Sequence, residues 1–459
     1  MSAPAAAGGT PLSDKSDLVA YLEAGCKPPE AWSIGTEHEK LVFRRDDLRR
    51  PTYDGPRGIE DVLHSLQRFG WDPAEENGKI IALRRADGST ITLEPGGQLE
   101  LSGAMLRTIH QTCAEIHKHL DQLRRVGDDL GVGLLGVGFD PKWGRDEVPM
   151  MPRERHHLMR ERMKTQGTLG EDMMIRTCTV QVNLDYSSEA DMVRKLRVSL
   201  ALQPISVAVF ANSPFAEGRP TGYLSYRAHV WTDTDPERCG PLEFGFDDGM
   251  GFERYTDYAL DVPLYFVYRE GRYIDARGQS FRDFLAGKLP ALPGERPTSS
   301  DWANHLTTLF PDVRLKTYLE QRGADGGPWQ RLCALPALWV GLLYDSESLD
   351  AAWQLVKDWT SETRASLRDQ VPERGLRAEV TLGGHRLSVN DIARQVLAIS
   401  RGGLERRQRT DSRSRSEALY LDPLDEIVAR KRSPAEDMLE CFHGKWQGDI
   451  DRMYEQLAY

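Results

Sequence analysis

Two glutamates, Glu37 and Glu39, lie one residue apart in the stretch GTEHEKLVF at residues 35–43. The β-forming residues around them predict a strand, and side chains two positions apart on a strand point to the same face. The pair therefore predicts two carboxylates on one face of a sheet, with His38 and Lys40 on the other. For this pair taken alone, a solvated edge strand is the alternative.

Three other stretches predict strands with a similarly polar face. TLEPGGQLELS places Glu94 and Glu100 on one face, provided that its Pro-Gly-Gly turn keeps the register. TCTVQVNLDY places Gln181 and Asn183 on one face, opposite a face of cysteine, valine and leucine. The third stretch, VRLKTYLEQR, is predicted as one strand whose shared polar face carries Arg314, Lys316, Tyr318, Glu320 and Arg322.

Because the four strands agree, the sequence predicts a sheet with one apolar face and one face rich in carboxylates, amides and cations. Crowded carboxylates repel one another unless cations lie among them. Hard oxygen ligands of this kind suit Mg²⁺, with Mn²⁺ as an alternative, and a nucleotide phosphate commonly completes the shell. Arginines on the same face would stabilise a transferring phosphoryl group. A merely solvated sheet face is the competing interpretation.

The elements that must position these residues are spread along the chain. Helices are predicted over residues 58–70, 105–130 and 188–211, with a hairpin over 79–102 and a mostly helical region from about 330 onward. Antiparallel strands with helices between and after them indicate an α+β fold. We find no internal repeat and no long linker. Residues 1–12 are interpreted as a disordered lead and residues 13–459 as a single domain.

The bulk composition is that of a globular protein with a large core, since 40% of the 459 residues are hydrophobic and 28% are charged. A net charge of −11 argues against a general nucleic-acid binder, so the arginine- and serine-rich run at 402–417 is interpreted as a solvated loop. Six cysteines without a CxxC motif predict reduced thiols. The sequence contains neither a signal-peptide pattern nor a long apolar run, so we expect a cytoplasmic protein without a membrane partner.

Several shorter motifs predict little. GVGLLGVG at 131–138 contains GxGxxG but follows a predicted helix, so it is interpreted as a strand of small residues rather than a dinucleotide site. Cys113 and His117 lie one helical turn apart, as in half of a zinc site, but no second half is present. His156 and His157 are predicted on the surface of an arginine-rich helix. The sequence contains no P-loop motif.

Long blocks of the chain resemble the plant-type glutamate–cysteine ligases, a family that also occurs in α-proteobacteria. The blocks include GTEHEKLVF, LEPGGQLELSGA, GTLGEDMMIRTCTVQVNLDYSSEADM, YRAHVWTDTD and YLEQRGADGGPWQRLCALPALWVGLLYD, and the resemblance runs from about Leu18 to the C-terminal MYEQLAY. It implies a glutamine-synthetase-like fold, in which a curved, largely antiparallel sheet forms a funnel with helices packed outside. It also implies the ATP-dependent coupling of L-glutamate to L-cysteine, the first step of glutathione synthesis.

The resemblance implies a role for each polar residue. The implied metal ligands are Glu37, Glu39, Glu94, Glu100 and Glu320. Arg322 would clamp the γ-phosphate of ATP, with Glu320 as its catalytic neighbour. The implied substrate-binding residues are Arg227, Arg176, Gln181, Asn183, Lys142 and Trp143. The expected partners are therefore small molecules, and the expected assembly is a monomer or a weak homodimer.

The sequence departs from the plant pattern at Ala276 and Ala291, where plant members carry two cysteines that form a regulatory disulfide. No regulation through that bridge is therefore expected. A plastid transit peptide is also absent, which fits the expected cytoplasmic location. Alternative functions are a related carboxylate–amine ligase with another amine acceptor, a more distant guanidino-group kinase, or a non-catalytic metal- or nucleotide-binding protein.

Overall fold

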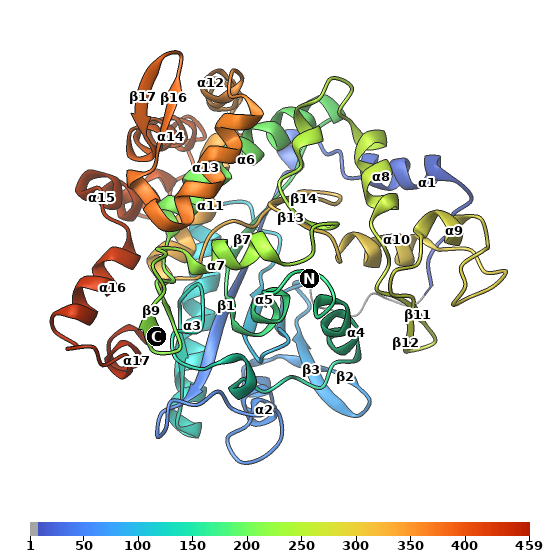
Figure 1. Cartoon of the computed structure of the whole chain (residues 1–459), viewed down its shortest axis with the longest axis horizontal. Coiled ribbons are helices and arrows are strands. Elements are labelled where there is room, and N and C mark those ends of the chain that lie inside the picture. The colour runs from blue at the N-terminus through green and yellow to red at the C-terminus, as the bar shows by residue number, and fades with distance from the viewer. Residues whose placement is uncertain (1–7) are drawn as a thin grey trace.

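A nine-stranded sheet forms the centre of the computed structural model, which describes residues 8–459 (Figure 1). The strand order is β14-β15-β7-β1-β5-β4-β3-β2, with β6 also paired to β1, and every neighbouring pair is antiparallel. The strands are β1 (Ile34–Arg44), β2 (Asp72–Glu76), β3 (Lys79–Arg84), β4 (Thr90–Leu93), β5 (Leu99–Ser102), β6 (Val132–Leu135), β7 (Val180–Leu184), β14 (Val313–Leu315) and β15 (Leu319–Gln321).

Helices surround this sheet, and those of the C-terminal third gather on one side of it (Figure 1). The helices before the β14–β15 hairpin are α1 (Lys15–Glu23), α2 (Ile59–Leu66), α3 (Ile109–Leu130), α4 (Glu154–Met163), α5 (Gly170–Arg176), α6 (Glu189–Phe210), α7 (Tyr226–Val230), α8 (Phe252–Asp261), α9 (Phe281–Leu285) and α10 (Ser299–Leu306). Those after it are α11 (Trp329–Leu343), α12 (Ser346–Val356), α13 (Ser361–Arg374), α14 (Val389–Arg406), α15 (Asp422–Arg430), α16 (Pro434–His443) and α17 (Asp451–Leu457).

Short strand pairs lie outside the nine-stranded sheet. They are β8 (Phe215–Ala216) with β9 (Arg219–Pro220), β10 (Cys239–Gly240) with β13 (Phe310–Pro311), β11 (Phe266–Arg269) with β12 (Arg272–Asp275), and β16 (Glu379–Leu382) with β17 (His385–Ser388). The expected α+β class is confirmed, since antiparallel strands and helices both contribute much of the chain.

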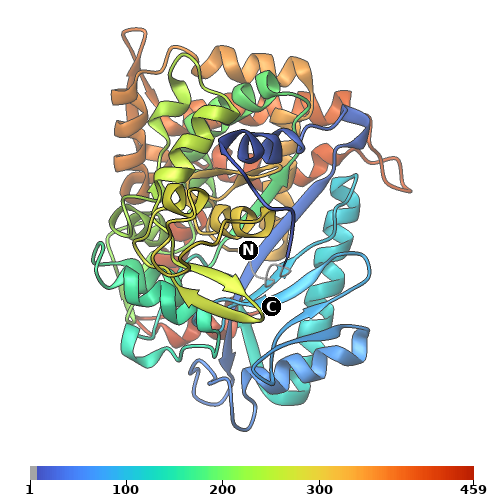
Figure 2. The same cartoon turned by 90° about the vertical axis from the view of Figure 1, so that its right-hand side faces the viewer.

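The predicted apolar face of the sheet exists and is covered by helices. Val180, Val182 and Leu184 of β7 are fully buried in a cluster that also contains side chains of α3, α6, α11 and α14. Figure 2 shows α3 running along the sheet as a single long helix. Burial on this scale fixes the register, because a slip by one residue would move the valines to the polar face.

The predicted strand over VRLKTYLEQR is instead a hairpin, so that sequence interpretation was wrong. The chain turns at residues 316–318, where the amide of Lys316 donates to the carbonyl of Tyr318 at 2.8 Å. The hairpin pairs Arg314 directly with Glu320. Residues paired across neighbouring strands point to the same face, so the two charged groups still share a face as expected.

Of the expected N-terminal lead, residues 1–7 lie outside the described residues. Pro11 forms an isolated bridge with Thr298, and Leu12 is buried at 5% exposure. None of the helices within residues 8–459 is both long enough and apolar enough to span a membrane.

The expectation that all cysteines are reduced thiols was wrong for one pair, because Cys113 and Cys333 form a disulfide. The two residues are 220 positions apart, but α3 and α11 pack against each other and bring their Cα atoms to 5.4 Å. Cys113 is thereby committed to the disulfide rather than to a zinc site. His117, the other half of that motif, packs against the ring of Trp329.

Reducing this disulfide should lower the stability of the protein, because the bridge restricts the unfolded chain across a long loop. We expect the free energy of unfolding to fall by about 2–4 kcal/mol. The measurement is thermal or denaturant unfolding followed by circular dichroism, with and without a thiol reductant. In Cys113→Ser the reductant should have no further effect, and an equal effect in that variant would contradict the assignment.

Candidate active site

Three strands present carboxylates and amides on the polar face of the sheet, as the alternation along each strand predicted. Glu39 of β1 lies opposite Glu100 of β5, and Glu37 of β1 lies opposite Gln181 of β7. Glu37 and Glu39 therefore share a face, as the spacing predicted. Both are buried, at 4% and 6% exposure, so the competing interpretation of a solvated strand does not hold for them.

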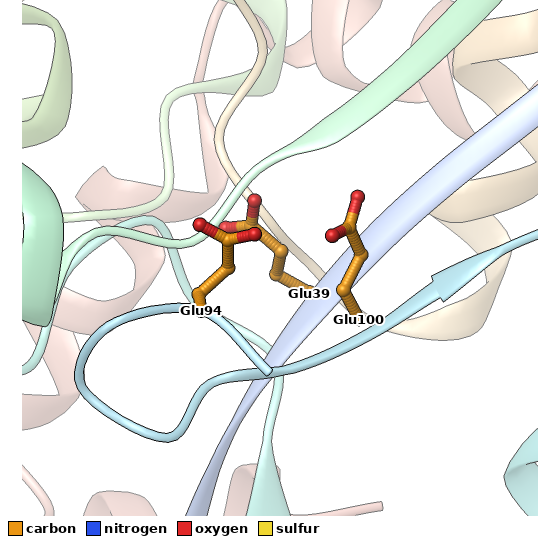
Figure 3. Close-up of side chains that lie close together, drawn as sticks. All are labelled: Glu39, Glu94 and Glu100. Carbon is orange, nitrogen blue, oxygen red and sulfur yellow. The ribbon is translucent and has the colours of Figure 1, made fainter. Parts of the chain in front are cut away.

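Glu39, Glu94 and Glu100 converge at one point of this face (Figure 3). One carboxylate oxygen from each lies within 4.8 Å of the other two. Burial raises the pKa of Glu39 well above its usual value, and the negative charges of Glu94 and Glu100 raise it further. Glu39 and Glu100 are buried and Glu94 is half-buried, and three carboxylates at this spacing fit a hard divalent cation, whose charge would remove the repulsion among them.

The turn that carries Glu94 is held from several sides. The side-chain oxygen of Gln98 accepts from the amide of Gly96 at 2.9 Å, and its amide group donates to the carbonyl of Thr177 at 2.9 Å. Arg50 donates to the carbonyl of Gly96 at 2.7 Å. A Cβ atom at Gly96 would meet the carbonyl oxygen of Ile175 at 2.2 Å, so only glycine allows this close approach.

Glu37 lies outside the three-carboxylate cluster and is bound by side-chain amides. Asn183 donates to one oxygen at 2.7 Å and Gln181 to the other at 3.4 Å. Burial raises the pKa of Glu37, and the nearby charges of Glu320 and Glu100 act in the same direction. Gln181 and Asn183 thus lie on the polar face as predicted, where they contact a carboxylate of the protein itself.

Glu320 is surrounded by cations rather than by carboxylates. Arg314 forms a bidentate ion pair with its carboxylate, with nitrogen–oxygen distances of 2.7–3.0 Å. The ammonium nitrogen of Lys316 lies 3.0 Å from a carboxylate oxygen, and Arg322 donates to the carboxylate at 2.5 Å. Burial alone would raise the pKa of Glu320, but Arg314, Lys316 and Arg322 lower it well below its usual value. Within residues 8–459 the three-carboxylate cluster does not include Glu320.

Arg322 and Arg227 lie between two cavities. The first, which we call the carboxylate cavity, has a volume of ≈ 480 Å³ and is lined by Glu39 and Glu94 among others. The second has a volume of ≈ 610 Å³ and contains Arg368 in its wall. Arg322 and Arg227 line both cavities, together with Trp231 and Phe310. Two guanidinium groups therefore adjoin the carboxylates, where they can bind an anionic substrate.

Arg227 is buried at 3% exposure and is fixed by backbone carbonyls. Its two terminal nitrogens donate to the carbonyls of Gly323 at 3.2 Å and Arg322 at 2.9 Å. Burial lowers the pKa of Arg227, and the charges of Asp325 and Glu39 act in the opposite direction. Among the described residues its Nε is buried and has no hydrogen-bond partner.

The structure does not bring Arg176, Lys142 and Trp143 to either cavity. Arg176 pairs with Asp172 at 2.9 Å, and Lys142 pairs with Asp451 of the C-terminal helix α17 at 2.5 Å. The indole of Trp143 donates to a backbone carbonyl at 2.6 Å. The Arg176 pair lies within helix α5, whereas Lys142 and Trp143 each join separate segments of the chain.

His38 and Lys40 point to the opposite face from the glutamates, as the alternation predicted. Both are fully buried, and Lys40 donates to the carbonyl of His38 at 3.1 Å. Burial lowers the pKa of Lys40 to about 7. The ring of His38 packs edge-on against His119 of α3.

Sequence reasoning missed several residues of the site. Arg314 and Lys316 were placed on the polar face but given no role, because their partner Glu320 was assigned to a metal. Trp231 lies in a one-turn 3₁₀ helix and Phe310 in the short strand β13, and neither element is long enough for a periodic pattern that could indicate a role. The expected surface position of His156 was wrong, since it is 4% exposed in α4.

A family model described as glutamate-cysteine ligase family 2 matches residues 33–456. Glutamate–cysteine ligase B, chloroplastic, of Oryza sativa subsp. japonica is 55% identical over 446 residues, which cover 97% of this chain and 87% of the relative. The chloroplastic glutamate–cysteine ligase of Arabidopsis thaliana is 54% identical over 446 residues, which cover 97% and 83%. The chain therefore belongs to glutamate-cysteine ligase family 2, a family of ligase enzymes, and the resemblance seen in its sequence is confirmed.

A solved structure agrees on the fold. The crystal structure of a glutamate–cysteine ligase from Francisella tularensis in complex with AMP has a TM-score of 0.56 to this chain and is 14% identical. It covers 93% of this chain, and the match covers 89% of that structure. At this identity the likeness concerns the fold alone.

The expected cytoplasmic location was wrong by this comparison. The rice and Arabidopsis relatives are both named chloroplastic, so the relatives do not share that location. The expectation had rested on N-terminal composition, and composition near one end of a chain does not determine where a protein works.

Glu39 lies among carboxylates and Glu320 among cations, so neutralising each residue should change the free energy of unfolding in a different direction. Glu320→Gln should lower the free energy of unfolding by about 3–5 kcal/mol, because it leaves buried cations without their counter-charge. Glu39→Gln should leave stability unchanged or raise it, because it removes a buried charge that its neighbours repel. Denaturant unfolding at pH 8 with a metal chelator measures both.

The exposed Glu75→Gln on β2 is the control for these substitutions and should leave stability unchanged. A larger loss of stability in Glu39→Gln than in Glu320→Gln would contradict this description of the charges.

Proposed function

We propose that this protein joins the γ-carboxylate of L-glutamate to the α-amine of L-cysteine, using ATP and giving γ-glutamylcysteine, ADP and phosphate. The observation that carries the proposal is the position of two buried guanidinium groups, Arg227 and Arg322, beside three convergent carboxylates. Membership of the ligase family supports the same reaction. We further infer that residues 13–459 form one catalytic unit, since Tyr459 at the end of the chain bonds to Leu134 of the central sheet.

Glu39, Glu94 and Glu100 are the residues proposed to hold the metal, with Mg²⁺ as the expected ion and Mn²⁺ as an alternative. The chemistry that the ion supplies when bound is partial neutralisation of the ATP phosphates. Glu37 and Glu320 had been expected in the same set. Because amides hold Glu37 and cations hold Glu320, we assign them to supporting the site.

Arg322 is proposed to bind the phosphoryl group that is transferred. It is anchored through Gln181 at 2.7 Å and through Glu320, which Arg314 holds in turn. A preorganised guanidinium stabilises charge on a transferring phosphoryl group without reorganising during the reaction. Arg227 is proposed to bind the carboxylate of an amino-acid substrate, for which a planar guanidinium is well shaped.

The proposed reaction has two steps. An oxygen of the γ-carboxylate of glutamate attacks the γ-phosphorus of ATP, and ADP leaves. The nitrogen of the cysteine α-amine then attacks the γ-carbonyl carbon of γ-glutamyl phosphate, phosphate leaves, and the nitrogen loses one proton. Both steps require the reacting groups to be held in contact, which buried binding groups achieve at a large gain in rate.

Release of ADP tests this proposal. We expect ADP release from MgATP only when glutamate and cysteine are both present, with γ-glutamylcysteine identified by its mass. A metal chelator should abolish turnover, and Glu39→Gln should lower it by about a hundredfold or more, since removal of one electrostatic group commonly costs that much.

Equal turnover with unrelated amines would instead indicate a ligase of broader acceptor range. An absence of turnover with every amine would overturn the catalytic proposal and favour a binding protein. Glu75→Gln again serves as the matched control and should retain full turnover.

A further inference from the structure

Asp325 is a buried carboxylate that no step of the proposed reaction uses. It follows strand β15 by four residues and is 2% exposed. Its oxygens accept from the hydroxyl of Ser213 at 2.7 Å, from the hydroxyl of Ser225 at 2.8 Å and from the backbone amide of Asn212 at 2.8 Å. Three donors from two separate segments thus converge on one carboxylate.

The two serines that donate to Asp325 also hold the helix that carries Arg227. The hydroxyl of Ser213 accepts from the backbone amide of Arg227 at 3.1 Å. Ser225 is the N-cap of α7, and its hydroxyl accepts from the amide of Ala228 at 3.2 Å. Each hydroxyl therefore donates to the carboxylate and accepts from the first turn of α7, so its orientation is fixed by Asp325.

The guanidinium of Arg227 is bound to the same segment of chain as Asp325. Its two terminal nitrogens donate to the carbonyls of Arg322 and Gly323, which precede Asp325 by three and two residues. The negative charge of Asp325 also favours the charged form of Arg227 in its buried setting. Asp325 therefore constrains Arg227 at two points, its backbone through the serines and its guanidinium through the segment that follows β15.

The glycine-rich stretch 131–138 contributes the space that Asp325 occupies. A Cβ atom at Gly138 would lie 2.4 Å from the carboxyl carbon of Asp325 and 2.6 Å from one of its oxygens. A side chain at position 138 would thus displace the carboxylate. This gives the last glycine of GVGLLGVG a role unrelated to nucleotide binding.

The same segment reaches the carboxylate cluster through Thr179. Thr179 forms an isolated bridge with Asp325, and its hydroxyl donates to the carbonyl of Ala324 at 2.7 Å. The backbone amide of Thr179 donates to the carboxylate of Glu39 at 3.0 Å. The segment around Asp325 is therefore bonded both to Arg227 and, through Thr179, to Glu39.

We propose that Asp325 is a positioning residue that sets the guanidinium of Arg227 for the carboxylate of an amino-acid substrate. The proposal rests on the proposed function, because it assumes that Arg227 binds such a carboxylate. Asp325 contacts neither substrate nor metal in this account and acts through Arg227.

Steady-state kinetics of Asp325→Asn test the proposal, because asparagine keeps the size of the side chain and removes its charge. We expect the KM for glutamate or for cysteine to rise about tenfold or more, while the KM for ATP changes less than twofold. Gly138→Ala should change the same KM in the same direction. Asp235→Asn is the matched control, because Asp235 is also buried but pairs with Arg238 at 2.8 Å, whereas Asp325 accepts from Ser213 and Ser225.

A double-mutant cycle with Arg227→Lys separates positioning from a general loss of stability. If Asp325 acts through Arg227, the double variant should have a KM within about twofold of that of Arg227→Lys alone. Fully additive effects, or equal increases in Asp235→Asn, would overturn the proposal. A wild-type enzyme that releases no ADP would instead overturn the proposed function, so the two failures are distinguishable.

Discussion

Electrostatic repulsion among buried carboxylates is the constraint on which the site depends. Glu39 and Glu100 are buried and Glu94 is half-buried, so water screens their like charges only weakly. Burial and the charges of Glu94 and Glu100 together raise the pKa of Glu39. A few strands away on the same face, Glu320 lies among three cations and its pKa falls. The sheet thus separates an anionic region, suited to a divalent cation, from a cationic region suited to a phosphoryl group.

Such a charge distribution persists because the rest of the fold is rigid around it. The opposite face of the sheet is largely apolar and is covered by α3, α6 and α11. The Cys113–Cys333 disulfide links α3 to α11. Glycines at positions 96 and 138 admit close approaches that position Glu94 and Asp325. The stability gained by burying the apolar face offsets the cost of crowding charges on the polar one.

The polar face could be predicted from the sequence because alternation along a strand is a local property. Glu37 with Glu39, and Gln181 with Asn183, share a face simply because they are two residues apart. The pairing of Glu39 with Glu100 depends on the register between two strands, which spacing within one strand does not determine. The hairpin turn at residues 316–318 was missed because the alternating pattern continues through it.

Contacts between distant segments could not be predicted from spacing. The network of Asp325 joins residues about 100 positions apart, and the disulfide joins residues 220 apart. Arg176, Lys142 and Trp143 lie in conspicuous sequence blocks but bind to structural elements, because a distinctive block can serve folding as well as chemistry. Sequence motifs indicated the kind of site, and which of the expected residues act in it stays a prediction.

The fate of the glutamate γ-carboxylate oxygen tests the central claim most directly. Glutamate labelled with ¹⁸O in its γ-carboxylate is incubated with the enzyme, cysteine and MgATP, and the phosphate released is analysed by mass spectrometry. An acyl phosphate pathway predicts that one ¹⁸O atom appears in phosphate for each γ-glutamylcysteine formed. Unlabelled phosphate accompanying labelled product would contradict it.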